Sequence, residues 1–186
     1  MVTVDSKPTR RAGPSRLLML LLVALTMVVA AGAAFLVLRT RGDALDRPQD
    51  PLSDEQSKAQ IVEPAKEIVA LAKLHSAVGG YILMSCKNRT DPPYQGAIYL
   101  TFDVPKATDY FDQVAASLVS HGWRQSPPPS RYLSGTTVSK NGVTAILYRD
   151  PDRTGSGIMK MYGECRNMVD HRNDTTDWVD ITDQFR

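Results

Sequence analysis

Near its start the chain carries its longest uninterrupted block of apolar residues. Residues 17–38 read LLMLLLVALTMVVAAGAAFLVL and contain no charged side chain. As a helix rising 1.5 Å per residue, this block spans roughly 33 Å, which matches a bilayer hydrocarbon core of about 30 Å. A helix also satisfies its own backbone polar groups in lipid. The pattern therefore predicts a transmembrane helix over residues 17–38.

Basic residues set the expected orientation of this helix. Residues 1–16 hold one acidic residue, Asp5, against four basic ones: Lys7, Arg10, Arg11 and Arg16. Short basic segments stay in the cytoplasm, so residues 1–16 are predicted to be a cytoplasmic tail and the C-terminal part to be extracytoplasmic. A cleaved signal peptide is the alternative, because residues 31–33 (AGA) resemble a cleavage site. Against it, the apolar run continues to Leu38.

A change of pattern after the apolar block marks a linker and then a helix. The polar residues 39–53, with two prolines, predict an extended tether. Ser53 with Gln56 fits a capping box and predicts a helix start. Pro64 predicts a kink or a division into two helical segments, and the glycine pair at 79–80 predicts the end of this region.

The rest of the chain alternates short apolar stretches with turn residues, which is typical of strands. The predicted strands are Tyr81–Cys86, Ala97–Phe102, Thr136–Ser139, Val143–Tyr148 and Ile158–Cys165. The pair Asn141-Gly142 predicts a type I′ hairpin, and Pro105 opens an amphipathic helix. Residues 54–186 are thus predicted to form an α+β domain, in which helices cover one face of a small antiparallel sheet.

Two cysteines, Cys86 and Cys165, each end a predicted strand on the side assigned to the outside of the membrane. An oxidising compartment favours one disulfide between them, which would close a loop of about 80 residues. Two buried thiols, or one reactive thiol, are the alternatives.

Charge outside the N-terminal segment argues against nucleic-acid binding. The chain has 22 basic and 20 acidic residues. Residues 1–38 contain four of the basic residues and one of the acidic residues, which leaves 18 against 19, or −1, for residues 39–186. Nucleic-acid binding relies on a basic excess, and this part of the chain has none.

Side chains that can act in catalysis or metal binding are present but do not form a recognised motif. The three histidines, His75, His121 and His171, are not spaced as a metal site, and no nucleophile elbow or phosphate-binding glycine loop occurs. Asp170-His171, close to Cys165, invites a metal or Cys-His interpretation, although a polar surface turn explains the same residues. The sequence therefore predicts no cofactor, no metal and no enzyme.

Prolines and aromatic residues suggest one interaction surface. Pro92, Pro93 and Tyr94 lie in a predicted loop and, with Tyr132, are predicted to form an exposed recognition surface. Rigid turns without a binding role are the alternative. The polar tail after Arg166 also contains three apolar residues able to dock onto the domain: Trp178, Ile181 and Phe185.

Four segments give the chain a family resemblance: SCKNRTDPPYQGAIYLTFDVP, SLVSHGW, SKNGVTAILYRDPD and MYGECRNMVDHR. Over residues 60–185 the chain resembles membrane-anchored or secreted envelope proteins of mycobacteria and related actinobacteria. The resemblance implies a bacterial source and a cell-envelope location. It transfers no functional residue, because no established activity accompanies this family.

These observations together favour a single-pass envelope protein whose outer domain binds a partner protein or a small envelope ligand. Two alternatives come from other classes of protein. An envelope hydrolase would need Asp170 and His171 to converge in a cleft. An accessory subunit of a membrane complex would use the small residues 30–34 for helix packing.

Overall fold

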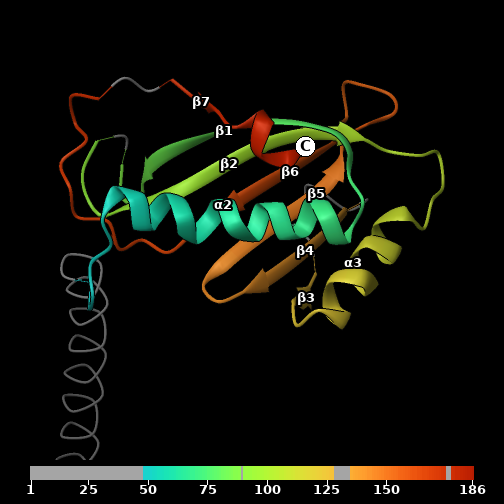
Figure 1. Cartoon of the computed structure of the whole chain (residues 1–186), viewed down its shortest axis with the longest axis horizontal. Helices are drawn as coiled ribbons and strands as arrows, with labels where there is room; N and C mark the ends of the chain where they lie inside the picture. Colours follow the sequence, from blue (N-terminus) through green and yellow to red (C-terminus); the bar gives the residue numbers. More distant parts are fainter. Residues whose placement is uncertain (1–47, 89, 128–134, 175–176) are drawn as a thin grey trace, which may run out of the picture. The chain divides into compact units, whose positions relative to one another are not determined.

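The computed structural model describes residues 48–88, 90–127, 135–174 and 177–186. The expected cytoplasmic tail, the transmembrane helix and most of the linker lie outside the described residues. Backbone contacts group Leu45–Arg186 into one compact unit, and its described elements are labelled in Figure 1. No helix within the described ranges is long and apolar enough to cross a bilayer.

Helix α2 spans Asp54–Leu71 and begins with the predicted capping box. The Ser53 hydroxyl accepts the backbone N–H of Gln56, and the Gln56 side chain accepts the backbone N–H of Ser53. Pro64 lies inside this helix and does not divide it into two segments. The proline removes one backbone hydrogen bond, but buried side chains on both sides of it hold the helix on the core: Ile61, Ala65 and Ile68.

Strand β1 spans His75–Ser85 and begins earlier than predicted, because Gly79 and Gly80 belong to it and do not end a helix. In the ladder with β2 (Tyr94–Asp103), Gly79 lies opposite Leu100 and Gly80 opposite Tyr99. A Cβ atom at Gly79 would lie only 2.5 Å from the carbonyl oxygen of Tyr99. Glycine at this position therefore permits close approach of two strands, a role that the local sequence does not reveal.

Helix α3 spans Tyr110–Ser120, starting later than Pro105. It buries Phe111, Val114, Ala115 and Leu118 of its predicted apolar stripe, whereas Val119 is exposed. Trp123 packs back into the core as expected, with 2% of its surface exposed. The remaining strands are β3 (Arg124–Ser126), β4 (Gly135–Lys140), β5 (Val143–Arg149), β6 (Ser156–Tyr162) and β7 (Val179–Asp180), followed by the 3-10 helix η2 (Thr182–Phe185). Positive φ angles of 49° at Asn141 and 79° at Gly142 fit the predicted hairpin turn between β4 and β5.

The described strands form one sheet in the order β3-β4-β5-β6-β2-β1-β7, in which every neighbouring pair is antiparallel. Figure 1 shows α2 lying across this sheet, with α3 next to β3 and β4. Tyr81, Ile98 and Leu100 point to the helical side and are buried. The α+β class with an antiparallel sheet is therefore confirmed for the described domain.

Candidate functional site

A shallow open groove lies at the β1–β7 edge of the sheet. Its lining residues are Val78, Gly79, Gly80, Trp178, Asp180 and Thr182, and its volume is about 220 Å³. We call it the Trp178 groove. Trp178 is 49% exposed and Val78 is 53% exposed, so large apolar side chains meet solvent here. Exposed apolar surface gathered in one hollow is typical of a binding site.

The backbone of two glycines, Gly79 and Gly80, forms the floor of this groove. Gly80 lies opposite Tyr99 in the ladder, on the sheet face turned away from the buried Tyr81–Ile98 pair. A Cβ atom at Gly80 would lie 3.0 Å from the Cβ of Trp178, so a larger residue would displace the indole. The Trp178 and Tyr99 rings are 6.3 Å apart between centroids, at 60° to each other. Two aromatic rings thus meet above a flat stretch of backbone.

The C-terminal segment is held at this edge by backbone and side-chain contacts. The N–H of Ile181 donates to the carbonyl of Gly79 at 3.0 Å, and the N–H of Gly79 donates to the Thr182 hydroxyl at 3.2 Å. The Ile181 side chain is 3% exposed and belongs to the core. The docking predicted for Ile181 is therefore present, whereas Trp178 stays half exposed.

Asp180 provides the negative charge of the groove. Its carboxylate accepts the backbone N–H of Thr182 at 2.8 Å. Hydrogen bonding from Thr182, with a smaller contribution from the charge of Arg186, holds the pKa of Asp180 below its usual value. Asp180 is therefore ionised at neutral pH, and the groove combines an aromatic wall with a fixed carboxylate.

Next to the groove, the outer sheet face carries further aromatic rings and one cation. The Lys160 ammonium lies 5.8 Å from the ring centroids of both Tyr99 and Tyr148. These distances are within the range of cation–π contacts. This face of the sheet therefore already pairs a cation with aromatic rings.

The structure does not expose the interaction surface expected from Pro92, Pro93 and Tyr94. Tyr94 is only 2% exposed, Pro93 is buried and Pro92 is half-buried, while Tyr132 lies outside the described residues. The Tyr94 hydroxyl donates to the carbonyl of Thr90, and its ring meets His171 edge-on, with centroids 4.9 Å apart. Long-range contacts bury this tyrosine, so the turn supports the fold.

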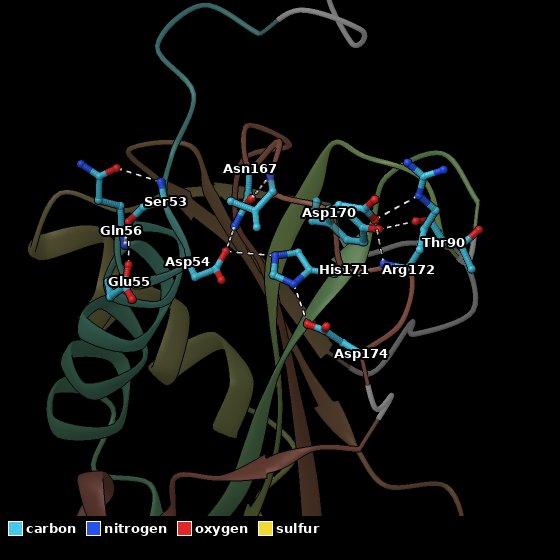
Figure 2. A network of polar contacts seen from close by, with 12 residues as sticks. Ser53, Asp54, Glu55, Gln56, Thr90, Asn167, Asp170, His171, Arg172 and Asp174 are labelled. Atoms are coloured by element: carbon cyan, nitrogen blue, oxygen red, sulfur yellow. Dashed lines mark hydrogen bonds and ion pairs between the residues drawn. The ribbon is translucent and has the colours of Figure 1, made fainter.

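A polar cluster joins the start of α2 to the tail, as Figure 2 shows. His171, whose side chain is 8% exposed, lies between two carboxylates: Nε2 is 3.0 Å from Asp54 and Nδ1 is 2.6 Å from Asp174. The buried Asn167 amide donates to Asp54 at 2.7 Å. Burial, with a smaller contribution from the charge of Asp54, also raises the pKa of nearby Tyr81. These contacts tie the helix start to the C-terminal segment.

Asp170 and His171 do not converge in a cleft. Arg172 donates its Nε and its backbone N–H to the Asp170 carboxylate, both at 3.0 Å. These hydrogen bonds hold the pKa of Asp170 below its usual value, and both side chains are more than half exposed. His171 has a carboxylate on each ring nitrogen, so neither nitrogen faces a nucleophile. Among the described residues no group of histidine, cysteine and acidic side chains is arranged to hold a metal ion.

The two cysteines form the disulfide Cys86–Cys165, with 6.0 Å between their Cα atoms. The bond links the end of β1 to the segment after β6. Leu52 pairs with Asn167 nearby, so the last residues of the expected linker dock onto the domain. Neither cysteine remains available as a nucleophile or as a metal ligand in this form.

Comparison with known proteins places the chain in a family. A family model described as "Putative lipoprotein LppJ" matches residues 53–184. Proteins with that description from Mycobacterium tuberculosis H37Rv and Mycobacterium bovis are each 41% identical to this chain over 170 residues, which cover 89% of this chain and 90% of the relative. No solved structure matches. The resemblance to mycobacterial envelope proteins is thereby confirmed, and the chain belongs to the LppJ family.

Proposed function

We propose that this chain is a single-pass membrane protein whose extracytoplasmic domain binds a partner protein or a small envelope ligand in the Trp178 groove. One observation carries the proposal: a half-exposed tryptophan stands beside an ionised carboxylate in an open hollow. Exposed apolar side chains that gather in one hollow mark a candidate binding site. In this proposal the domain acts by binding and performs no chemical step.

The anchor in this proposal is the apolar segment 17–38, with residues 1–16 in the cytoplasm. Its length and the basic residues before it support that arrangement. The disulfide gives independent support for an extracytoplasmic domain, because such bonds persist in oxidising compartments. Protease added to intact spheroplasts should digest residues 48–186 and spare residues 1–16. Protection of the domain in intact spheroplasts, together with its digestion after lysis, would contradict this orientation.

The cysteines bear on how the chain is attached to the membrane. The family description names a lipoprotein, and bacterial lipoproteins carry their lipid on a cysteine thiol. This chain has two cysteines, and both take part in the disulfide. Attachment through the apolar segment is therefore the proposal for this member. Cells fed an alkyne-tagged fatty acid should yield unlabelled protein, and a labelled chain would refute helix-only attachment.

A site-specific cross-link tests the binding role. A photoreactive amino acid would replace Val78, which lines the groove and is 53% exposed, or Asp112, which is exposed on α3. Position 78 should give one discrete adduct in intact cells, identified by mass spectrometry. A second variant carrying Trp178→Ala should lose this adduct. The same adduct from position 112, or an adduct that persists without Trp178, would refute the groove as the binding site.

A further inference from the structure

The charges around the Trp178 groove are predominantly negative. Residues 177–186 contain three acidic residues, Asp177, Asp180 and Asp183, and one basic residue, Arg186, which gives −3 + 1 = −2. Arg186 lies 3.4 Å from Asp183, and both side chains are largely exposed, so this pair interacts weakly. Asp180 lines the groove itself. A ligand for this groove should therefore carry positive charge.

Aromatic rings add a second preference for a cation. Trp178 is the ring type with the strongest attraction for ammonium and guanidinium groups, and it is half exposed. The resident cation of this face, Lys160, is on β6, which is separated from β7 by β2 and β1. Three strand spacings place its backbone about 14 Å away, and its ammonium is held beside the rings of Tyr99 and Tyr148. Among the residues that line the groove, the charged one is Asp180.

Size and shape limit what the groove can hold. A volume of about 220 Å³ is below the range of about 300–1,000 Å³ that is typical of sites for drug-sized molecules. Such a hollow accepts one long side chain. Its floor is the flat backbone of Gly79 and Gly80, along which an extended segment can lie. The apolar Val78 and Trp178 suit the aliphatic stem of lysine or arginine.

We propose that the Trp178 groove receives a lysine or arginine side chain from an extended segment of a partner protein. This inference rests on the proposed function and specifies its partner. The aliphatic stem packs on Val78 and Trp178, the cationic head reaches Asp180, and neighbouring Asp177 adds attraction. An anionic membrane surface is the wrong partner, because the same carboxylates would repel it.

The test uses the full chain in zwitterionic lipid nanodiscs and three synthetic peptides that differ only in charge: Ac-GVKVKVG-NH2, Ac-GVQVQVG-NH2 and Ac-GVEVEVG-NH2. The chain has two tryptophans, so ¹⁵N labelling gives two indole signals. The buried Trp123 serves as the internal reference. The lysine peptide should shift the Trp178 signal in a saturable way, with a dissociation constant of about 1 mM. The glutamine peptide should bind at least about threefold more weakly, and the glutamate peptide should cause no shift.

Variants assign the preference to particular carboxylates. Asp180→Asn should reduce the ratio of lysine-peptide to glutamine-peptide affinity to about one. Asp180 also holds the Thr182 N–H, so a second variant, Asp177→Asn, is needed. The Asp177 carboxylate makes no hydrogen bond within the described residues. Its replacement should lower the affinity ratio in part. Asp112→Asn, on helix α3, is the matched control and should leave the ratio unchanged. Raising the salt from about 0.05 M to about 0.5 M should weaken only the lysine peptide.

Two results would overturn the inference. Equal shifts by the lysine and glutamine peptides, unaffected by Asp180→Asn, would show that the groove binds a peptide without selecting a positive charge. No shift by any peptide would also overturn it. Failure of the proposed function itself would be recognised separately, as the absence of a Trp178-dependent cross-link from position 78 in cells.

Discussion

Replacing Cys86 and Cys165 together by serine should destabilise the domain by about 4 kcal/mol. The two residues are 79 positions apart. For a closed loop of that length, the chain-entropy model gives an entropy loss of about 15 cal/mol/K in the unfolded state, or about 4.5 kcal/mol at 25 °C. Domains of this kind have total stabilities of about 5–15 kcal/mol. Loss of the bond should therefore bring the domain close to its unfolding threshold.

Urea unfolding followed by tryptophan fluorescence measures this effect, because Trp123 is buried in the folded domain. The full chain in non-ionic detergent would be compared with the double serine variant, with and without reductant. The variant should unfold at lower urea and with a steeper dependence on urea, because its unfolded chain is more expanded. Reductant should shift the native chain toward the variant and leave the variant unchanged.

A destabilisation below about 1 kcal/mol would refute loop closure as the source of this stability. A large destabilisation with an unchanged urea dependence would point instead to contacts around the sulfurs. Both cysteines are half-buried, so serine itself should contribute little. Single variants are less informative, because each leaves a free thiol that can cross-link two chains.

Four substitutions test other parts of the structure by the same urea assay. Ile181→Ala should destabilise the domain by about 2–4 kcal/mol, because it opens a cavity where the tail meets the core; a loss under about 1 kcal/mol would contradict this docking. His171→Ala should lose about 1–3 kcal/mol, because Asp54 and Asp174 lose their shared partner; an unchanged midpoint would make the cluster incidental. Gly142→Ala should lose about 1–2 kcal/mol, because φ is +79° and the new Cβ would lie 2.5 Å from the Glu164 carboxyl carbon; no loss would show that the turn adapts. Trp178→Ala should change stability by no more than about 0.5 kcal/mol while abolishing the cross-link; a larger loss would assign the indole to the fold.

Features encoded by neighbouring residues could be predicted from the sequence. The capping box at Ser53 and Gln56 and the turn at Asn141-Gly142 depend on side chains at most three residues apart. Each has a local physical cause, a side-chain hydrogen bond in one case and a positive φ angle in the other. The same holds for the amphipathic stripe of α3, whose spacing alone identifies its buried face.

Features that depend on residues far apart in the chain could not be predicted in this way. Gly79 and Gly80 match the pattern of a helix terminus, but the strand opposite them explains their occurrence. Tyr94 looks exposed beside two prolines, yet His171 and Asn167 approach it from more than 70 positions away and bury it. The Trp178 groove likewise joins β1 to the tail. The local sequence signal of this site is a tryptophan, Trp178, within a polar tail.

The C-terminal segment shows how one short strand serves both the fold and the groove. Successive side chains of a strand point to opposite faces, so Trp178 and Asp180 share the groove while Ile181 enters the core. Ile181 and the backbone of Gly79 hold the segment in place, and that support does not involve the indole. Binding and stability should therefore respond to different substitutions within four residues. That separation permits a change at Trp178 to be read as a change in binding, whereas Asp180 also holds the Thr182 N–H and needs the second variant, Asp177→Asn, beside it.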